Sequence, residues 1–319
     1  MVSERMTKEQ NDIFIVCLST VAILGLSGNI IFVSTIFCRA LESKFTNYLL
    51  RSQSLIDSVV CIVTIIIVIF PDPMTSGNVN VDSVFCHIWT SQAIFWWTVL
   101  ASIYNLIFLA VDRYSAVIIP QSYKNKIKKK IFFAYSIIFG CTGLSVIPAF
   151  FQYTFQNGTC LTQMDFVGES AKFAFKSFSI YWFIAVYGFP APLLIFLYSK
   201  IIWKLYESFK RDKRISMQAS MKSFTKSTLI NTIIFLITIA YDAMYYMLGY
   251  LGVVEYVLYS PTQRVGVFLT SVNSSTNPLV FFILVKSFRR KFLMVWCKKC
   301  VRKSSNKVEN NNMGKHSST

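Results

Sequence analysis

Long apolar segments alternate with short basic segments along this chain. No Asp, Glu, Lys or Arg occurs in residues 13–38, 83–111, 131–164 or 177–199. Each run is longer than the roughly 20 residues that a helix needs to cross the hydrocarbon core of a bilayer. We therefore predict seven transmembrane spans, at residues 12–37, 48–70, 84–116, 131–152, 178–206, 224–250 and 258–285.

Composition supports a membrane protein. Hydrophobic residues make up 54% of the 319 positions and charged residues only 15%, whereas soluble proteins carry about 25% charged residues. The 29 phenylalanines exclude a disordered chain, and 8 cysteines are too few for a disulfide scaffold of this length. The expected fold class is all-α: a seven-transmembrane helix bundle followed by a short amphipathic eighth helix.

The net charge of +17 reflects membrane topology. Cytoplasmic loops of membrane proteins are enriched in Lys and Arg, and almost all of the 32 basic residues fall on one side of the predicted spans or at their edge. The exceptions are Arg5, Lys8, Lys172, Lys176 and Arg264. This asymmetry predicts an extracellular N-terminus and a cytoplasmic C-terminus in the plasma membrane. The basic residues are split among short loops, so we expect contact with membrane lipid and no nucleic-acid partner.

The spans divide the chain into four parts. Residues 1–11 form an extracellular N-terminus, 12–285 the transmembrane domain, 286–300 the amphipathic eighth helix and 301–319 a polar, disordered cytoplasmic tail. No internal repeat is visible, which argues against transporters built from duplicated halves. No His, Cys and carboxylate cluster has metal-ligand spacing and no glycine-rich phosphate loop occurs, so we expect no enzyme activity.

Several short motifs follow one another in a specific order. They are Gly28-Asn29, then Asn47, Leu49 and Asp57, then Asp112-Arg113-Tyr114, then Pro190 and Tyr198, then Asn273-Ser274-Ser275-Thr276-Asn277-Pro278, and finally Phe288-Arg289-Arg290-Lys291-Phe292. Together they resemble the rhodopsin-like (class A) G-protein-coupled receptors, from about Gly28 to Phe292. The stretches around Trp89 and Tyr104 are similar to divergent invertebrate receptors of the peptide or orphan type.

The resemblance implies a cell-surface receptor that binds an extracellular ligand and activates a heterotrimeric G protein by a conformational change. It assigns the G-protein switch to Asp112, Arg113, Tyr114, Tyr198 and Phe281, and a packing triad to Ile103, Pro190 and Phe235. In the switch, Arg113 pairs with Asp112 at rest and is released when span six moves. The simpler alternative is that Arg113 is an ordinary cytoplasmic-side arginine with a neighbouring counter-ion.

Asp57 lies near the middle of the membrane, where a carboxylate is costly unless it is solvated or paired. Ser102 of span three and Asn273, Ser274 and Asn277 of span seven would complete an oxygen-rich cluster suited to a small cation. The resemblance implies that this cation is sodium, acting as an allosteric modulator that favours the inactive state. The alternative is a hydrogen-bonded polar core with Asp57 protonated.

Three covalent modifications are expected. Cys86 and Cys160 lie outside the cell, where cysteine pairs are oxidised, and the resemblance implies a disulfide between them. Asn157-Gly158-Thr159 is a glycosylation sequon in an outer loop. Cys297 and Cys300 follow an amphipathic stripe among basic residues, which suits palmitoylation, although unmodified thiols are the alternative.

Four positions depart from the family pattern. Thr238-Ile239-Ala240-Tyr241 replaces the usual tryptophan and proline kink of span six, Phe281 replaces a tyrosine, and span four lacks its tryptophan. Cys86 precedes Arg113 by 27 positions (113 − 86), about two more than the family pattern, so the upper part of span three is uncertain by about half a turn. The departures keep two alternatives open, a receptor-like scaffold that no longer couples and a transporter or channel.

The ligand class follows by elimination. An opsin needs a lysine where this chain has Ser271, and a monoamine receptor needs an acid in the upper part of span three, where none occurs. We therefore expect a peptide. The candidate pocket residues are Trp96, Val99, Trp182, Ile239, Asp242, Tyr246, Arg264 and Ser271, with Trp97 and Tyr245 as further aromatic walls or interfacial anchors. Asp242 either pairs with Arg264 or receives a cationic group of the ligand.

Overall fold

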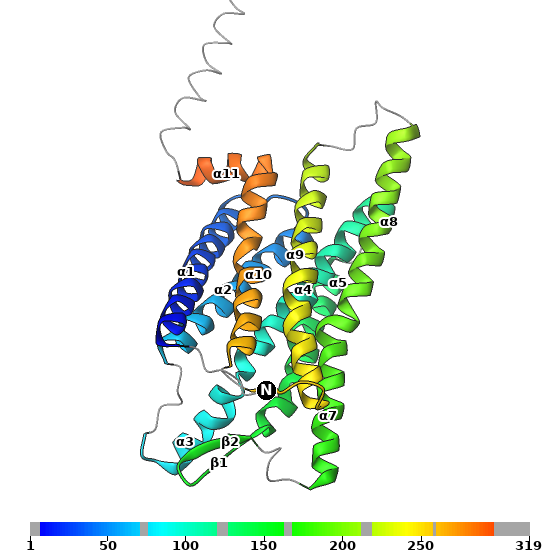
Figure 1. Cartoon of the computed structure of the whole chain (residues 1–319). Helices are drawn as coiled ribbons and strands as arrows, with labels where there is room; N and C mark the ends of the chain where they lie inside the picture. Colours follow the sequence, from blue (N-terminus) through cyan, green and yellow to red (C-terminus); the bar gives the residue numbers. More distant parts are fainter. Residues whose placement is uncertain are drawn as a thin grey trace, which may run out of the picture.

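The computed structural model describes residues 7–70, 76–119, 127–162, 168–211, 219–257 and 260–296 of the chain. This part is a bundle of long helices with a short hairpin at one end and a helix lying across the other end (Figure 1). Seven helical segments in it are long and apolar enough to cross a membrane, which confirms the predicted fold class.

Four spans are single helices: α1 (Lys8–Cys38), α2 (Lys44–Ile69), α9 (Ala219–Tyr250) and α10 (Pro261–Leu284). Each of the other three consists of two α-helical segments with a short π-helical turn between them. These segments are α3 (Val79–Phe85) with α4 (Ala93–Ile118), α5 (Ile127–Tyr135) with α6 (Thr142–Val146), and α7 (Glu169–Phe183) with α8 (Pro190–Arg211). The amphipathic α11 (Lys286–Trp296) follows, and Cys297, Cys300 and the predicted tail lie outside the described residues.

Several helices begin earlier than their apolar segments. The fifth span was predicted from residue 178, yet α7 begins at Glu169 and includes Lys172 and Lys176. Hydropathy marks the part of a helix that lies in lipid, whereas backbone hydrogen bonds continue into water until a cap or turn ends them. Local capping sets other boundaries: the Ser260 hydroxyl accepts from the Gln263 backbone amide immediately before Pro261 begins α10.

The upper part of span three accommodates its extra residues by local distortion. Residues Cys86–Thr90 form a π-helical turn. Gln92 then adopts a left-handed backbone conformation with φ 52° before α4 begins. From Ala93 to Ile118 the helix is continuous. The register below Gln92 is therefore the ordinary helical one, and the uncertainty is confined to residues above it.

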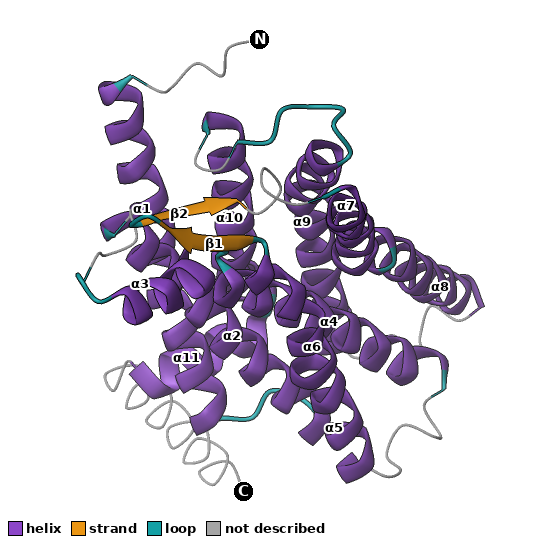
Figure 2. Cartoon of the chain, turned by 90° about the horizontal axis from the view of Figure 1, so that it is seen from below, coloured by secondary structure: helices purple, strands orange, loops and turns teal. Residues whose placement is uncertain are grey.

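A β-hairpin that the sequence analysis missed covers the end of the bundle opposite α11 (Figure 1), named the outer end because the sequence predicts that it faces outside the cell. Strand β1 (Tyr153–Gln156) pairs antiparallel with β2 (Thr159–Thr162), and Asn157-Gly158 makes the turn. Asn-Gly between two short strand-like segments is a recognised hairpin signal that the analysis read only as a glycosylation sequon. The predicted disulfide between Cys86 and Cys160 is confirmed, with a Cα–Cα distance of 5.6 Å, and ties the hairpin to span three. Figure 2 shows the hairpin across this end, next to α3.

Two apolar clusters form the interior. The larger includes Trp182, Ile103 and Phe235 from three different spans, and the smaller includes Phe224 and Phe281 near α11. Many large apolar side chains remain on the outside; Ile237, for example, is 69% exposed. Such an apolar exterior would associate in water, and it is the surface expected of a protein solvated by lipid.

Candidate functional site

A small cavity lies inside the outer end of the bundle, beneath the hairpin. Its free space is about 30 Å³, room for one or two water molecules. It is lined by Ser91, Gln92, Trp96, Ala149, Gln152, Tyr153, Phe178, Trp182, Asp242, Tyr246 and Tyr256. Four predicted pocket residues, Trp96, Trp182, Asp242 and Tyr246, are therefore brought together here, and Val99 and Ile239 lie in the adjoining apolar core.

Two other predicted pocket residues do not line this cavity. The Arg264 guanidinium donates a hydrogen bond to the Asn11 side chain and lies 5.9 Å from the centre of the Phe14 ring. The expected ion pair with Asp242 is absent among the described residues. Arg264 turns instead toward α1, which the sequence alone did not place beside span seven.

Ser271 also faces away from the cavity. Its hydroxyl donates to the Val267 carbonyl at 2.9 Å and lies 3.3 Å from the Thr64 hydroxyl of α2. Among the additional aromatic walls, Trp97 donates to the Thr142 hydroxyl of span four and Tyr245 donates to the Glu255 carbonyl. These contacts place the Trp97 and Tyr245 side chains against neighbouring segments outside the lining of the cavity.

Asp57 lies in a polar core below the cavity, fully buried. Its Oδ1 accepts from the Ser102 hydroxyl at 2.7 Å, and its Oδ2 accepts from the Asn277 amide at 2.6 Å. The Gln53 amide nitrogen also donates to both carboxylate oxygens, at 3.2 and 3.0 Å, and to the Ser102 hydroxyl at 2.6 Å. The predicted residues Ser102 and Asn277 therefore contact Asp57, and Gln53 is a member that the sequence analysis missed.

The position of Gln53 bears on the predicted sodium site. A cation held by both Asp57 and Ser102 would need the position beside their oxygens that the Gln53 amide nitrogen occupies, 3.0 Å from Asp57 Oδ2 and 2.6 Å from the Ser102 hydroxyl. Gln53 is itself held by the Asn105 amide, which donates to Gln53 Oε1 at 2.6 Å. In this conformation N–H and O–H donors surround the carboxylate, and a sodium ion at this cluster stays a prediction. Asn273 and Ser274 are both buried in α10, and the Ser274 side chain also forms a hydrogen bond with Asp57.

The packing triad lies between the cavity and the inner end of the bundle. Ile103 and Phe235 are 1% and 0% exposed and belong to one apolar cluster. Pro190 is buried at the start of α8, two positions after the π-helical turn Ile184–Gly188 ends. Tyr187 of that turn lies 6.3 Å from the Phe235 ring and donates to the Leu236 carbonyl. Spans three, five and six thus meet at this level.

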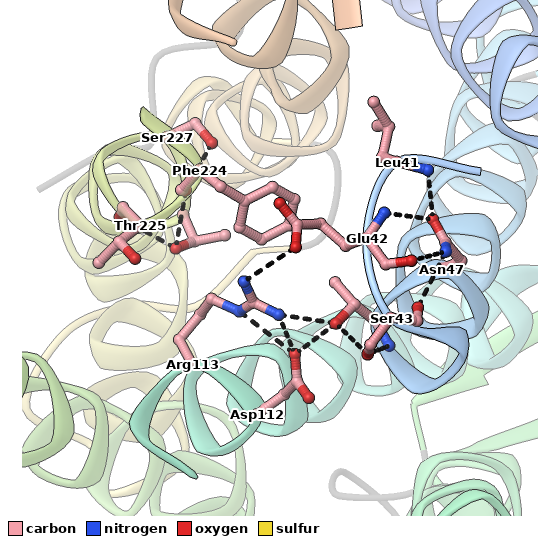
Figure 3. A network of polar contacts seen from close by, with 11 residues as sticks. Leu41, Glu42, Ser43, Asn47, Asp112, Arg113, Phe224, Thr225 and Ser227 are labelled. Atoms are coloured by element: carbon pink, nitrogen blue, oxygen red, sulfur yellow. Dashed lines mark hydrogen bonds and ion pairs between the residues drawn. The ribbon is translucent and has the colours of Figure 1, made fainter. Parts of the chain in front are cut away.

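Arg113 lies at the inner end, buried to 2% exposure. Its guanidinium is 2.5 Å from Asp112 Oδ2, donates to the Thr46 hydroxyl at 2.6 Å and is 4.0 Å from Glu42 Oε2 (Figure 3). The ring of Phe224 from α9 covers it at 4.4 Å. The predicted Asp112–Arg113 pair is present. Thr46 of α2, Glu42 of the turn before it and Phe224 of α9 are distant in sequence and had no local signal.

The Asn47 side chain holds the turn that places Glu42 near Arg113. Its side-chain oxygen accepts from the Leu41 and Glu42 backbone amides at 2.8 and 3.2 Å, and its nitrogen donates to the Glu42 carbonyl at 2.6 Å. The amide thus fixes the short turn between α1 and α2 with Glu42 directed inward (Figure 3). Burial raises the pKa of the Glu42 carboxyl above its usual 4.5, and the nearby Arg113 charge opposes that rise.

The other switch residues lie in apolar surroundings. Tyr114 and Tyr198 pack in the larger cluster with Ile103 and Phe235. Phe281, which replaces a tyrosine, packs its ring 5.2 Å from Phe224 and 5.1 Å from Phe32. The missing hydroxyl is therefore replaced by an aromatic contact that joins span seven to the ring covering Arg113.

Comparison with known proteins identifies the family. A family model described as "7 transmembrane receptor (rhodopsin family)" matches residues 28–281. The chain belongs to this family. Its members are receptors and not enzymes, so this chain is a multi-pass membrane receptor.

Three relatives are similar to this receptor at low identity along most of their length. Neuropeptide Y receptor type 6 of Mus musculus is 23% identical over 89% of this chain and 81% of its own. G-protein coupled receptor 183 of Bos taurus is 22% identical over 86% and 78%, and the Allatostatin-A receptor of Bombyx mori is 22% identical over 86% and 77%.

Proposed function

We propose that this receptor lies in the plasma membrane with its N-terminus outside, binds an extracellular peptide and activates a heterotrimeric G protein in the cytoplasm. The basic residues on the inner loops support this orientation. Two of the three relatives above are named as receptors for neuropeptide Y and allatostatin-A, which supports a peptide ligand.

The observation that carries the proposal is the buried, paired Arg113 at the end opposite the cavity. Trp96 and Arg113 lie 17 residues apart on the same helix (113 − 96), which corresponds to about 25 Å. Phe224 covers the guanidinium from α9 and the Ile103–Phe235 packing connects α9 to the cavity region. A ligand that moves α9 outward would remove the ring, and the exposed arginine would then contact the G protein.

Nucleotide exchange tests the proposal directly. Purified receptor in lipid nanodiscs would be mixed with several heterotrimeric G proteins and screened with amidated and basic peptide libraries. We expect one peptide class to accelerate exchange, and Arg113→Gln to abolish that acceleration while peptide binding persists. No exchange with any G protein would favour a scaffold that no longer couples, and ion flux through receptor liposomes would favour a transporter or channel.

Sodium and the modifications belong to the same proposal. Sodium modulation requires the Gln53 amide to leave its position beside Asp57 and Ser102, since it donates to both. Asn157 lies exposed at the tip of the hairpin, which suits attachment of a glycan. Palmitoylation of Cys297 and Cys300 stays a prediction from their basic, amphipathic surroundings.

A further inference from the structure

The carboxylate of Asp242 lacks a protein partner. Asp242 is only 5% exposed and lines the outer cavity. Among the described residues it accepts no hydrogen bond and forms no ion pair. A buried, unpaired carboxylate is costly, so Asp242 either takes up a proton or pairs with a cation that the chain does not supply.

Helix α10 leaves space for the Asp242 carboxylate but supplies no cation to pair with it. Gly266 of α10 packs against Asp242, and a methyl group at that position would collide with the carboxylate. Arg264 lies on the same helix and is bound to Asn11 instead. Of the described residues that line the cavity, Asp242 alone is ionic. The cavity therefore contains one carboxyl group with no cationic partner among the described residues that line it.

A second acceptor faces the same cavity. Gln92 is 5% exposed, lines the cavity, and its Oε1 is buried without a hydrogen-bond partner among the described residues. The left-handed backbone at Gln92, φ 52°, places it in the break above α4. Two orphan acceptors in one cavity are complementary to a group that only donates, and guanidinium and ammonium groups are such donors.

Aromatic rings form the walls beside these acceptors. Trp96 meets Trp182 edge-on, with ring centres 6.3 Å apart, and Tyr246 meets Tyr256 edge-on at 5.6 Å. Cations are attracted to the faces of such rings, especially where water is excluded. A carboxylate surrounded by tryptophan and tyrosine rings is therefore an environment selective for an organic cation.

We propose that this cavity binds a guanidinium or ammonium group of the extracellular ligand, which pairs with Asp242 and donates to Gln92 between the aromatic rings. The inference rests on the proposed receptor function and specifies its ligand chemistry. The present free space of about 30 Å³ is too small for such a group. Tyr256, which is seated against Gly249 on the segment between α9 and α10, must move outward when the cation binds.

Binding of small probes tests this chemistry without a G protein. Purified full-length receptor in nanodiscs would be titrated with N-acetyl-arginine amide, N-acetyl-lysine amide and the neutral, arginine-shaped N-acetyl-citrulline amide, by saturation-transfer NMR. We expect at least tenfold tighter binding of a cationic probe than of citrulline, about 1.4 kcal/mol. The arginine and lysine probes distinguish a guanidinium site from an ammonium site.

Variants locate the effect. Asp242→Asn should abolish the cation preference, whereas Glu255→Gln, which removes an exposed acid of the neighbouring outer loop, should retain it. The melting temperature of ligand-free Asp242→Asn should equal or exceed that of the wild type, because the substitution removes a buried carboxyl group that has no partner to lose. A lower melting temperature would reveal a structural partner and overturn the proposal.

The proposal would also be overturned if the wild type bound the citrulline and arginine probes equally. It would be overturned as well if no probe bound at its solubility limit. Both tests use the wild type alone, so they hold even if Asp242→Asn cannot be purified. The outcome is independent of coupling. A receptor that exchanges nucleotide but shows no cation preference would keep the proposed function and lose this inference.

Discussion

Burial disfavours the ionised form of the Glu42 carboxyl and raises its pKa above the usual 4.5. A carboxyl with a raised pKa in the folded protein stabilises folding most below its ordinary pKa, and this contribution is lost as the pH rises through the folded pKa. Its partial burial, 23% side-chain exposure, and its 4.0 Å distance from Arg113 make the ion pair weak. At neutral pH, Glu42 therefore restrains Arg113 without stabilising the fold.

We predict that Glu42→Gln is as stable as the wild type or more stable at pH 7, by less than about 1 kcal/mol. The difference should vanish as the pH approaches 4, where the wild-type carboxyl is protonated. Thermal melts between pH 4 and 7 would measure this. Glu169→Gln, at an exposed ion pair with Lys172, is the matched control and should show no such trend. Destabilisation of Glu42→Gln by more than about 1 kcal/mol at pH 7 would contradict the prediction.

Gln53 is a second single residue with a testable role, because its side chain connects Asp57, Ser102 and Asn105 in the polar core. Because its amide satisfies Asp57 and Ser102, we predict that Gln53→Ala creates space for a cation. The melting temperature of Gln53→Ala should then rise more in sodium chloride than in choline chloride, by a larger margin than for the wild type. The double variant with Asp57→Asn should lose that margin. A sodium response that Gln53→Ala does not increase would remove the role assigned to Gln53.

At the scale of elements, a chain of aromatic contacts joins α9, α10, α1 and α11. Phe224 covers Arg113 and packs on Phe281, Phe281 packs on Phe32, and Phe32 packs on Phe288 of α11 at 4.7 Å. Tight apolar interfaces of this kind adopt discrete arrangements and do not deform continuously. The packing of Phe224 on Phe281 therefore holds the inner end of α9 over Arg113, whereas Phe32 and Phe288 attach α1 and α11 to the same cluster.

We predict that Phe224→Ala raises ligand-independent nucleotide exchange severalfold, since it removes the ring over Arg113. It should also cost about 3–5 kcal/mol of stability, as for other buried phenylalanines. Phe288→Ala is the control: Phe288 is 2% exposed and belongs to the same cluster, so stability should fall without a rise in exchange. The idea fails if both variants raise exchange equally or neither does.

At the scale of the whole molecule, the disulfide connects the hairpin to the bundle. Cys86 and Cys160 are 74 positions apart, so opening their bond releases a long loop and enlarges the unfolded ensemble, by about 4 kcal/mol in the chain-entropy account. The hairpin also lies above the cavity, with Tyr153 in both. Its attachment therefore affects stability and ligand binding together.

We predict that the double variant Cys86→Ser with Cys160→Ser melts at a lower temperature and loses peptide binding. Replacing both residues avoids an unpaired thiol. Cys141→Ser, at an exposed free cysteine, should behave as the wild type in both assays. Normal melting and binding of the double variant would show that the hairpin is held by its other contacts alone.

The sequence by itself determined the seven spans and the family, and it predicts their orientation. Hydropathy and charge are properties of consecutive residues, and a bilayer selects on them segment by segment. The motifs around Asp57 and Arg113 could be recognised for the same reason. Even the disulfide followed from the resemblance, although Cys86 lies about two positions farther from Arg113 than in the family pattern.

Only the tertiary structure decided which side chains meet across helices. Arg264 turns toward Asn11 and leaves Asp242 unpaired, Gln53 occupies the space assigned to a cation, and Glu42 and Phe224 complete the contacts of Arg113. These contacts depend on the rotation and spacing of helices distant in sequence, which packing fixes through many small contributions. A one-residue shift turns a helical side chain by about 100°, so the partner of a buried polar residue is a property of the assembled bundle.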